Sequence, residues 1–293
     1  MSNRTESYLV GLVGDGVMPS LTPPMHEREA DVQGLRYLYR PIDLLELGLP
    51  GESVGDLLKS ARNLGFNGLN ITHPCKQLVL QHLDEVSQDA LKLGAVNTVV
   101  IRDGLFVGHN TDFSGFASAL KAGLPDARLE RVVQLGAGGA GSAVAYALLT
   151  AGVRTLDLVD TDPGRCAARA TELAGFFPDS TVTARTTAEL PQMMPLADGL
   201  VHCTPVGMAA HPGVPLDLGL LEPRHWVADI VYRPIETELV VGARAKGCDV
   251  LDGGRMAVGQ AADAFRIFTG VDADADRMRS HFLELVAAEE VAA

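Results

Sequence analysis

The chain has 293 residues, 47% of them hydrophobic, and a formal net charge of −13 at pH 7 with a pI near 5.0. This length suits one large or two medium hydrophobic cores, and two domains are the better expectation. The acidic charge argues against a nucleic-acid-binding face, which needs clustered lysine and arginine, and against attraction to anionic membranes.

The missing targeting signals and the scattered cysteines both favour a cytoplasmic location. No run approaches the roughly 20 apolar residues of a membrane span, and the N-terminus lacks the apolar core of a signal peptide. The four cysteines, Cys75, Cys166, Cys203 and Cys248, are scattered without C-x-x-C or zinc-ligand spacing. A cytoplasmic protein with reduced thiols and no metal site is therefore expected.

Apolar runs suited to strands alternate with helical periodicity, which indicates an α/β protein with mainly parallel sheets. In the first half, helices are predicted near 53–64 and 76–86, the second of them directly after a proline. Strands are predicted near 8–14, 35–42, 68–72 and 96–102.

The second half continues the alternation. Helices such as 163–176 and 237–246 are predicted between five buried strands, at 131–135, 155–160, 182–186, 199–203 and 227–231. The segments 256–268 and 273–289 have the pattern of amphipathic helices with no strand after them, so we expect them to fold back onto the first domain. The sequence thus predicts one domain from 1–112 plus 256–293 and a second from 113–255.

A glycine-rich segment, Gly136-Ala137-Gly138-Gly139-Ala140-Gly141, follows the strand predicted at 131–135 and precedes a helical pattern. In such a loop the first glycine permits a tight turn, and the next lets backbone N–H groups approach a pyrophosphate. The last glycine lets the helix pack closely while its N-terminus faces the anion. An ordinary strand-to-helix turn is the alternative, but the strand, loop and helix together favour a Rossmann-type dinucleotide site.

Asp160 ends the next predicted strand, near the spacing of about 20 residues expected for an acid that accepts from the adenosine ribose hydroxyls. A carboxylate there also repels a 2′-phosphate, which favours NAD over NADP. Arg165 lies in the following helix and faces either the cofactor or solvent.

Lys76 and Asp112 suggest the chemistry of the first domain. Oxidising a secondary alcohol by hydride transfer requires a group that takes the hydroxyl proton, and a lysine held beside an aspartate can do so. Taken singly, Lys76 is better explained as a solvated residue of a helix, and Asp112 is explained equally well as the N-cap of a helix.

Eight segments spread over nearly the whole chain resemble the shikimate dehydrogenase family, particularly its NAD-dependent quinate/shikimate dehydrogenase branch. The segments are 20–23 with His26, 70–76 (NITHPCK), 94–98, 110–112, the glycine loop, 203–208 (CTPVGM), 229–234 and 260–265 (QAADAF). The resemblance implies that the first domain binds substrate and that the second, a Rossmann domain, binds NAD.

The resemblance also implies residue roles. Lys76 is the acid/base and Asp112 its partner. Ser20 and Thr22 hold a substrate carboxylate, Thr72, Asn97 and Gln260 bind ring hydroxyls, and Tyr232 reaches the substrate. The cofactor positions are the loop residues Gly136, Ala137, Gly138, Gly139 and Ala140, together with Asp160, Arg165, Thr204, Pro205, Val206, Met208, Ile230 and Gly253.

The sequence departs from the family pattern at several of these positions. Thr22 stands where a second serine is usual, and Asp160 replaces the basic stretch of the NADP-using members. Both departures favour the NAD-using branch, with shikimate, quinate or both as substrate. An aminated shikimate, a non-catalytic nucleotide sensor and a homodimeric assembly remain open. A short-chain dehydrogenase is disfavoured, because Thr72 replaces the tyrosine of the Tyr-x-x-x-Lys pattern.

Overall fold

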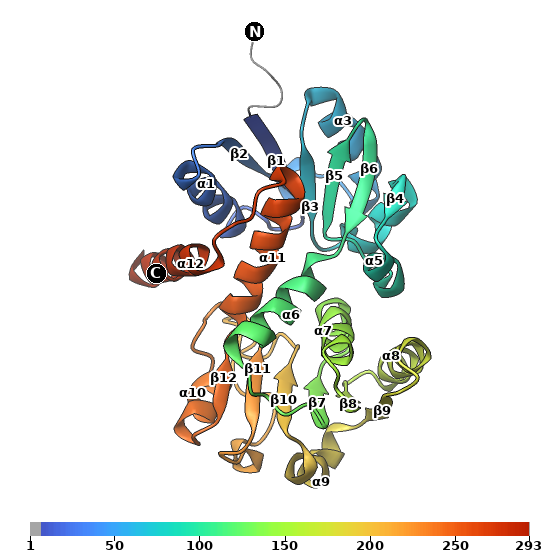
Figure 1. Cartoon of the computed structure of the whole chain (residues 1–293), viewed down its shortest axis with the longest axis vertical. Coiled ribbons are helices and arrows are strands. Elements are labelled where there is room, and N and C mark those ends of the chain that lie inside the picture. The colour runs from blue at the N-terminus through green and yellow to red at the C-terminus, as the bar shows by residue number, and fades with distance from the viewer. Residues whose placement is uncertain (1–6, 293) are drawn as a thin grey trace. The chain divides into compact units, whose positions relative to one another are not determined.

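The computed structural model describes residues 7–292, which form two compact units (Figure 1). The described residues of the first unit run to Thr111 and resume at Val258, and the second unit spans Asp112–Ala257. The chain therefore crosses to the second unit in the first turn of α6 (Thr111–Gly123) and returns within α11 (Gly253–Thr269). The structure places Asp112, Met256 and Ala257 in the second unit rather than the first.

The first unit holds a six-stranded sheet in the order β2-β1-β3-β5-β6-β4. Its strands are β1 (Ser7–Gly14), β2 (Arg36–Asp43), β3 (Gly68–Ile71), β4 (Glu85–Val86), β5 (Thr98–Arg102) and β6 (Leu105–His109). The β3–β5 and β5–β6 pairs are antiparallel and the other pairs are parallel, so only β5 runs against the rest. The prediction of a mainly parallel sheet is confirmed.

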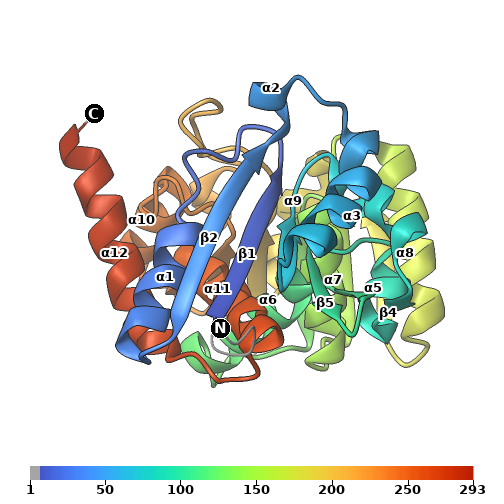
Figure 2. The ribbon, with the colours of Figure 1, turned by 90° about the horizontal axis from the view of Figure 1, so that it is seen from above.

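Two layers of helices cover this sheet. The first unit contains α1 (Thr22–Val32), α2 (Leu44–Leu47), α3 (Val54–Leu64), α4 (Cys75–Leu78), α5 (Gln88–Leu93), most of α11 and α12 (Ala275–Ala292). One apolar cluster joins α3, α4 and α5 to β1, β3, β5 and β6. A second cluster joins α1 and α11 to β1 and β2, and Figure 2 shows α1 lying beside β2.

The predicted helix over 76–86 is wrong in its extent. The helix α4 ends at Leu78, a 3₁₀ turn follows over Val79–His82, and β4 begins at Glu85. The backbone N–H of Asp84 donates to the carbonyl of Phe106 at 2.9 Å, and the Asp84 carboxylate accepts from the Phe106 N–H at 2.8 Å. Pairing with β6, a strand that the sequence analysis did not predict, therefore overrides the local helical pattern.

The second unit is a Rossmann fold. Its parallel sheet has the order β12-β11-β10-β7-β8-β9, in which the chain starts at the centre, runs to one edge, and then crosses back to build the other half. The strands are β7 (Arg131–Leu135), β8 (Thr155–Val159), β9 (Thr181–Arg185), β10 (Gly199–His202), β11 (Trp226–Asp229) and β12 (Asp249–Leu251). The helices are α6, α7 (Gly139–Thr150), α8 (Pro163–Phe176), α9 (Leu190–Met193) and α10 (Glu238–Ala245).

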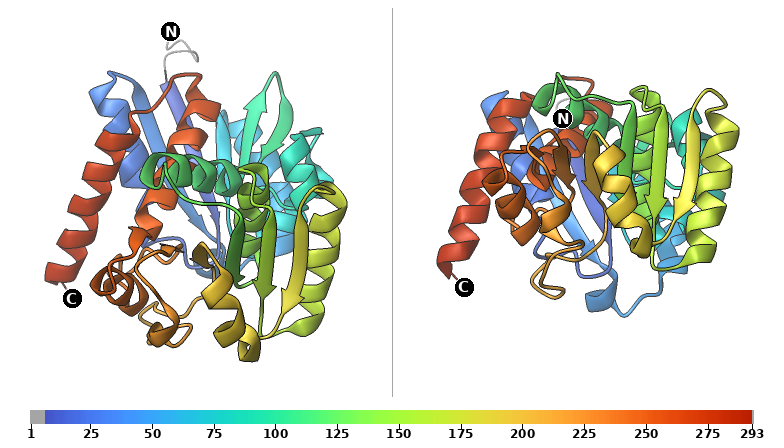
Figure 3. Two further views of the ribbon diagram at one scale, coloured as in Figure 1. Left: turned by 60° about the horizontal axis from the view of Figure 1, so that its bottom comes forward. Right: turned by 90° about the horizontal axis from the view of Figure 1, so that it is seen from below.

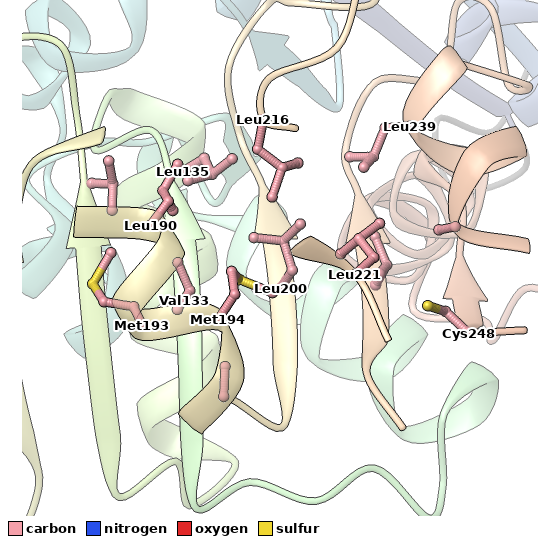
Figure 4. Close-up of a cluster of buried hydrophobic side chains, with 14 residues drawn as sticks. Val133, Leu135, Leu190, Met193, Met194, Leu200, Leu216, Leu221, Leu239 and Cys248 are labelled. Atoms are coloured by element: carbon pink, nitrogen blue, oxygen red, sulfur yellow. The ribbon is translucent and has the colours of Figure 1, made fainter. Parts of the chain in front are cut away.

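One apolar cluster of this unit lies between the sheet and the helices α9 and α10. Figure 4 shows Leu135 and Leu200 from the strands packing with Leu190, the first residue of the short helix α9, with Met194, which follows that helix, and with Leu239 of α10. The edge strand β9 lies beside α8 and is only half-buried, so the prediction of five buried strands is wrong there (Figure 3). The sixth strand, β12, was not predicted. Among residues 7–292, no helix is both long and apolar enough to cross a membrane.

An ion pair between the half-buried Arg277 and the buried Glu29 joins α12 to α1 within the first unit. Arg277 donates to both carboxylate oxygens of Glu29, at 2.7 and 2.6 Å, and the Asp274 N–H donates to Glu29 at 2.9 Å. Burial alone raises the pKa of Glu29, but the donations from Arg277, Asp274 and Gln33 outweigh it and lower the pKa below its usual value. Glu29 therefore adds stability above the usual carboxyl pKa, and this contribution is lost as the pH falls through the lowered value.

Arg277→Ala should lower the free energy of unfolding by about 2 kcal/mol at neutral pH, because it leaves the Glu29 carboxylate buried without its strongest donor. Urea denaturation of both proteins across acidic pH should show the difference shrinking as Glu29 becomes protonated. Arg28→Ala is the matched control, since Arg28 joins the same two helices through an exposed pair with Glu284 and should cost under about 1 kcal/mol. An equal loss in the two variants would contradict this account.

Candidate functional site

The glycine loop after β7 adopts a conformation that requires glycine at two positions. Gly136 has a φ of +99°, and a Cβ there would lie 2.6 Å from the carbonyl oxygen of Cys203. A Cβ on Gly141 would lie 2.3 Å from the carbonyl oxygen of Gly136. The first glycine thus permits the turn, and the last lets α7 pack against the loop.

The middle of the loop is open. A Cβ added to Gly138 or Gly139 would meet no atom within 4 Å. Gly138 is the N-cap of α7 and has no side chain with which to cap the first turn. Open space beside the positive end of a helix is what a pyrophosphate requires, so the loop fits a dinucleotide. Ala140 follows in the first turn of α7.

A pocket of about 360 Å³ adjoins this loop within the second unit. Gly136 and Gly138 line it from the loop between β7 and α7, Asp160 from just after the end of β8, Arg165 from α8, and the segment 203–206 from the loop after β10. Because β7 and β10 are neighbours whose connections leave in opposite directions, the pocket lies at the topological switch point of the sheet, where Rossmann folds bind their ligands.

Asp160 is held from several directions. Its carboxylate accepts from the N–H groups of Ala137 at 2.7 Å and Asp162 at 2.9 Å, and from the Arg165 guanidinium at 2.5 and 3.2 Å. Burial raises the pKa of Asp160, but these donors outweigh burial and lower it, so the group is ionised at neutral pH. The four bonds use the lone-pair sites of the carboxylate, so a ribose hydroxyl must displace one of them.

Arg165 is the donor most easily displaced. Its side chain is 48% exposed, and exposed ion pairs are worth only about 0–1 kcal/mol. From the sequence, the Arg165 side chain could face either the cofactor or solvent. In the structure the residue lines the pocket while remaining in contact with solvent.

The opposite wall of the pocket follows β10. Thr204, Pro205 and Val206 line it, as does Cys203. Burial, with a smaller effect from the charge of Asp229, raises the pKa of the Cys203 thiol well above its usual value. The thiol is therefore neutral and unsuited to act as a nucleophile.

Six of the predicted cofactor positions are not among the residues that line this pocket: Ala137, Gly139, Ala140, Met208, Ile230 and Gly253. Met208 is 41% exposed, Ile230 is half-buried after β11, and Gly253 begins α11. A Cβ on Gly253 would lie 2.3 Å from the carbonyl oxygen of Val231, so glycine is required there for packing.

Lys76 lies in the short helix α4 of the first unit and is half-buried. Its carbonyl accepts from the Val96 N–H at 2.9 Å, which ties α4 to the segment that carries Asn97. Thr72 is also half-buried and connects β3 to α4, since its N–H donates to Val13 and its carbonyl accepts from Cys75.

Asn97 belongs to a buried polar network. Its side-chain oxygen accepts from the Thr111 N–H at 2.7 Å, and its amide nitrogen donates to the Thr111 hydroxyl at 3.0 Å. Thr98 and Asn70 extend the network to the Tyr39 hydroxyl. Asp112, next to Thr111, is buried in the first turn of α6 and is not the N-cap that sequence reasoning offered as an alternative.

Ser20 and Thr22 lie at the start of α1, both half-buried. The Ser20 hydroxyl accepts from the Thr22 N–H at 3.3 Å. Gln260 is half-buried in α11. Tyr232 is 37% exposed and lies beyond the end of β11 at Asp229, not within a strand.

Sequence reasoning missed residues that support these groups. Gln134, fully buried in β7, donates its amide N–H groups to the carbonyls of Gly136 and Gly141 and so holds the glycine loop closed. A polar residue inside an apolar strand was the available signal. Asp43 accepts from the N–H groups of Gly16 and Met18 and fixes the loop before Ser20.

In comparisons with known proteins, the chain matches family models and relatives that are named as shikimate or quinate/shikimate dehydrogenases. Residues 12–99 match the model of the shikimate dehydrogenase substrate binding domain, and residues 254–281 match that of the shikimate 5′-dehydrogenase C-terminal domain. A shikimate dehydrogenase (NADP(+)) of Pseudarthrobacter chlorophenolicus is 87% identical over the whole length of both chains. A quinate/shikimate dehydrogenase (NAD(+)) of Corynebacterium efficiens is 52% identical over 96% of this chain and 99% of its own.

Among solved structures, the quinate dehydrogenase of Corynebacterium glutamicum in complex with NAD superposes with a TM-score of 0.91 at 51% identity, covering 95% of this chain and 99% of that one. The fold, the glycine loop and these relatives agree, and the chain belongs to the shikimate dehydrogenase family.

Proposed function

We propose that the chain catalyses the reversible, NAD-dependent oxidation of the ring hydroxyl of shikimate and of quinate to the 3-dehydro acids. Family membership supports a nicotinamide-dependent oxidoreductase of this substrate class. The observation that carries the finer proposal is the ionised Asp160 in the wall of the pocket at the switch point.

The choice of NAD rests on this chain's own residues, because its relatives are named for both cofactors. The carboxylate of Asp160 offers acceptors to two ribose hydroxyls once Arg165 has moved. A 2′-phosphate there would meet like charge and would lose those hydrogen bonds. Arg165 neutralises part of this repulsion, so the preference depends on both residues.

In the proposed mechanism the bound nicotinamide supplies the hydride acceptor. Lys76 takes the proton of the ring hydroxyl during oxidation and returns it during reduction, and Asp112 fixes the position of its ammonium group. Both groups are withdrawn from bulk water, Asp112 fully and Lys76 in part, which limits competing proton exchange.

Neutral donors hold the substrate in this proposal. Ser20 and Thr22 bind the carboxylate, Thr72, Asn97 and Gln260 bind ring hydroxyls, and Tyr232 reaches the substrate. Hydroxyl and amide donors suit a protein with a net charge of −13, because they satisfy a buried carboxylate without a long basic side chain.

Quinate and shikimate should both be oxidised with NAD, with kcat/KM values within about 10²-fold of each other. Quinate carries one extra hydroxyl where shikimate has a ring double bond, and a pocket not built against a hydroxyl discriminates only to this extent. The methyl group of Thr22 stiffens χ1 and shifts the hydroxyl that meets the carboxylate. Steady-state kinetics with both acids measure the ratio.

Thr22→Ser is the matched variant, since it keeps the hydroxyl and removes the methyl group. If Thr22 is what allows both acids to be oxidised, Thr22→Ser should shift the ratio of the two kcat/KM values toward one acid. No detectable quinate turnover beside brisk shikimate oxidation would contradict dual use and leave a shikimate-only enzyme.

A further inference from the structure

A buried chain of hydrogen bonds runs from the pocket of the second unit into its sheet. His202 and Asp229 end the neighbouring strands β10 and β11 in the same register and are 0% and 2% exposed. His202 Nδ1 lies 2.9 Å from Asp229 Oδ1, and His202 Nε2 lies 2.5 Å from the Thr204 hydroxyl. These hydrogen bonds thus link Thr204, which lines the pocket, to His202 and Asp229, two buried titratable groups that the proposed reaction does not use.

The hydrogen positions in this series of hydrogen bonds can be assigned by starting from Thr237, at the end away from the pocket. The Thr237 hydroxyl accepts from the Val240 N–H at 3.1 Å, so its own hydrogen goes to Asp229 Oδ2 at 2.7 Å. Asp229 Oδ1 also accepts from the Val231 N–H at 3.0 Å. A carboxylate surrounded by donors is acceptor-only, so the hydrogen of the His202 ring lies on Nδ1.

This tautomer determines what Thr204 presents to a ligand. In the neutral His202 ring with its hydrogen on Nδ1, Nε2 carries no hydrogen, and the Thr204 hydroxyl then donates its hydrogen to it. The Thr204 oxygen accepts from the Val206 N–H at 3.3 Å and keeps further acceptor capacity. Thr204 lines the pocket, and any further partner of its hydroxyl oxygen must therefore be a hydrogen-bond donor.

The topology indicates which part of a dinucleotide meets Thr204. The strands β7 to β9 form the first mononucleotide-binding half of a Rossmann fold, with Asp160 at the adenosine end, and β10 opens the second half. Thr204 follows β10 directly. It is thus placed for the nicotinamide-nucleoside half.

We propose that His202 and Asp229 are positioning residues that hold the Thr204 hydroxyl as a hydrogen-bond acceptor for the nicotinamide-nucleoside half of the bound dinucleotide. This inference rests on the proposed dinucleotide-binding function of the pocket. It does not depend on the choice between NAD and NADP, because both carry the same nicotinamide half.

A second histidine of the same unit provides the contrast. His225 is 1% exposed and hydrogen-bonded, but its partners are the Glu222 N–H at 3.0 Å and the Met194 carbonyl at 3.0 Å. These contacts join loops of the unit and include no residue that lines the pocket. His225→Asn therefore controls for the loss of a buried, hydrogen-bonded histidine.

The test uses His202→Asn, Thr204→Val and the double variant in the full chain. Asparagine retains an amide that can donate to Asp229 but is too short to reach Thr204. Isothermal titration calorimetry should show each single variant binding NADH and NADPH about 3- to 10-fold more weakly, as expected for one neutral hydrogen bond. Affinity for ADP should stay within about 2-fold of wild type, because ADP lacks the nicotinamide half.

Non-additivity is the decisive result. If His202 acts through Thr204, the double variant should bind the reduced dinucleotides no more weakly than Thr204→Val alone. Thr204→Ser should restore affinity, and His225→Asn should leave it unchanged. Thermal unfolding of every variant separates loss of affinity from loss of fold.

Three outcomes would overturn the inference: additive losses, an equal loss of ADP affinity, or full affinity in folded His202→Asn. A wild-type chain that binds neither reduced dinucleotide would overturn the proposed function as well. Tight binding of NADPH in place of NADH would overturn only the choice of NAD and would leave the variants to decide the role of His202.

Discussion

Lys76→Met should lower kcat for shikimate oxidation by about 10²- to 10⁴-fold, the usual contribution of a general acid/base. Methionine keeps the length and much of the packing of the side chain but cannot exchange a proton. The KM for shikimate should change less, because the hydroxyl and amide donors that hold the substrate remain. Steady-state kinetics at saturating NAD measure both constants.

Lys59→Met is the control for this prediction. Lys59 belongs to the first unit, in α3, and its side chain is 60% exposed and paired with Asp56. The control should keep wild-type kcat. If Lys76→Met turns over within a few-fold of wild type, Lys76 does not carry the proton, and the acid/base must be sought elsewhere.

The second large effect concerns the cofactor. The wild-type chain should use NAD in preference to NADP by a factor on the order of 10² in kcat/KM, because like-charge juxtaposition and lost hydrogen bonds cost several kcal/mol. Asp160→Asn should narrow the preference, mainly by raising kcat/KM for NADP. Arg165→Ala should widen it, because it removes the cation that offsets the charge of Asp160.

Asp162→Asn tests whether the effect is local. Asp162 carries the same charge two residues away, but it caps α8 and is half exposed to solvent. The cofactor preference should survive this change almost intact. Equal use of NAD and NADP by the wild-type chain would contradict the assignment of Asp160.

Local patterns with a strict geometric meaning were predicted best. The loop from Gly136 to Gly141 specifies a turn, an open centre and a close helix contact, and the turn at Gly136 and the contact at Gly141 are backbone properties that glycine alone permits. The strand before the loop and the helix after it follow from their apolar patterns, so the Rossmann fold could be predicted from sequence.

Elements that depend on distant partners were predicted poorly. The segment after Lys76 has helical periodicity, yet it forms β4 because Asp84 and Ser87 pair with the backbone of β6. The short strand β12 is likewise defined by its register with β11. The spacing of residues within one segment does not predict which distant strand it pairs with, because the two strands meet only in the folded sheet.

The residues of the candidate site show the same difference between local patterns and distant contacts. Asp160 was predicted because its position after a strand has a known meaning. Gln134, Asp43 and His202 were not singled out, because a buried polar residue reveals its partner only in three dimensions. The four donors that fill the Asp160 carboxylate also became visible only in the structure.

The most direct test of the account mixes the purified chain with NAD and shikimate and follows the absorbance of the reduced cofactor, with Lys76→Met in parallel. We predict steady accumulation of the reduced cofactor with the wild-type chain and almost none with the variant. Quinate and an aminated shikimate, tested in the same way, identify the preferred acid. A folded wild-type chain that binds NAD but reduces none of it with any of the three acids would contradict the central claim and favour a nucleotide-binding sensor.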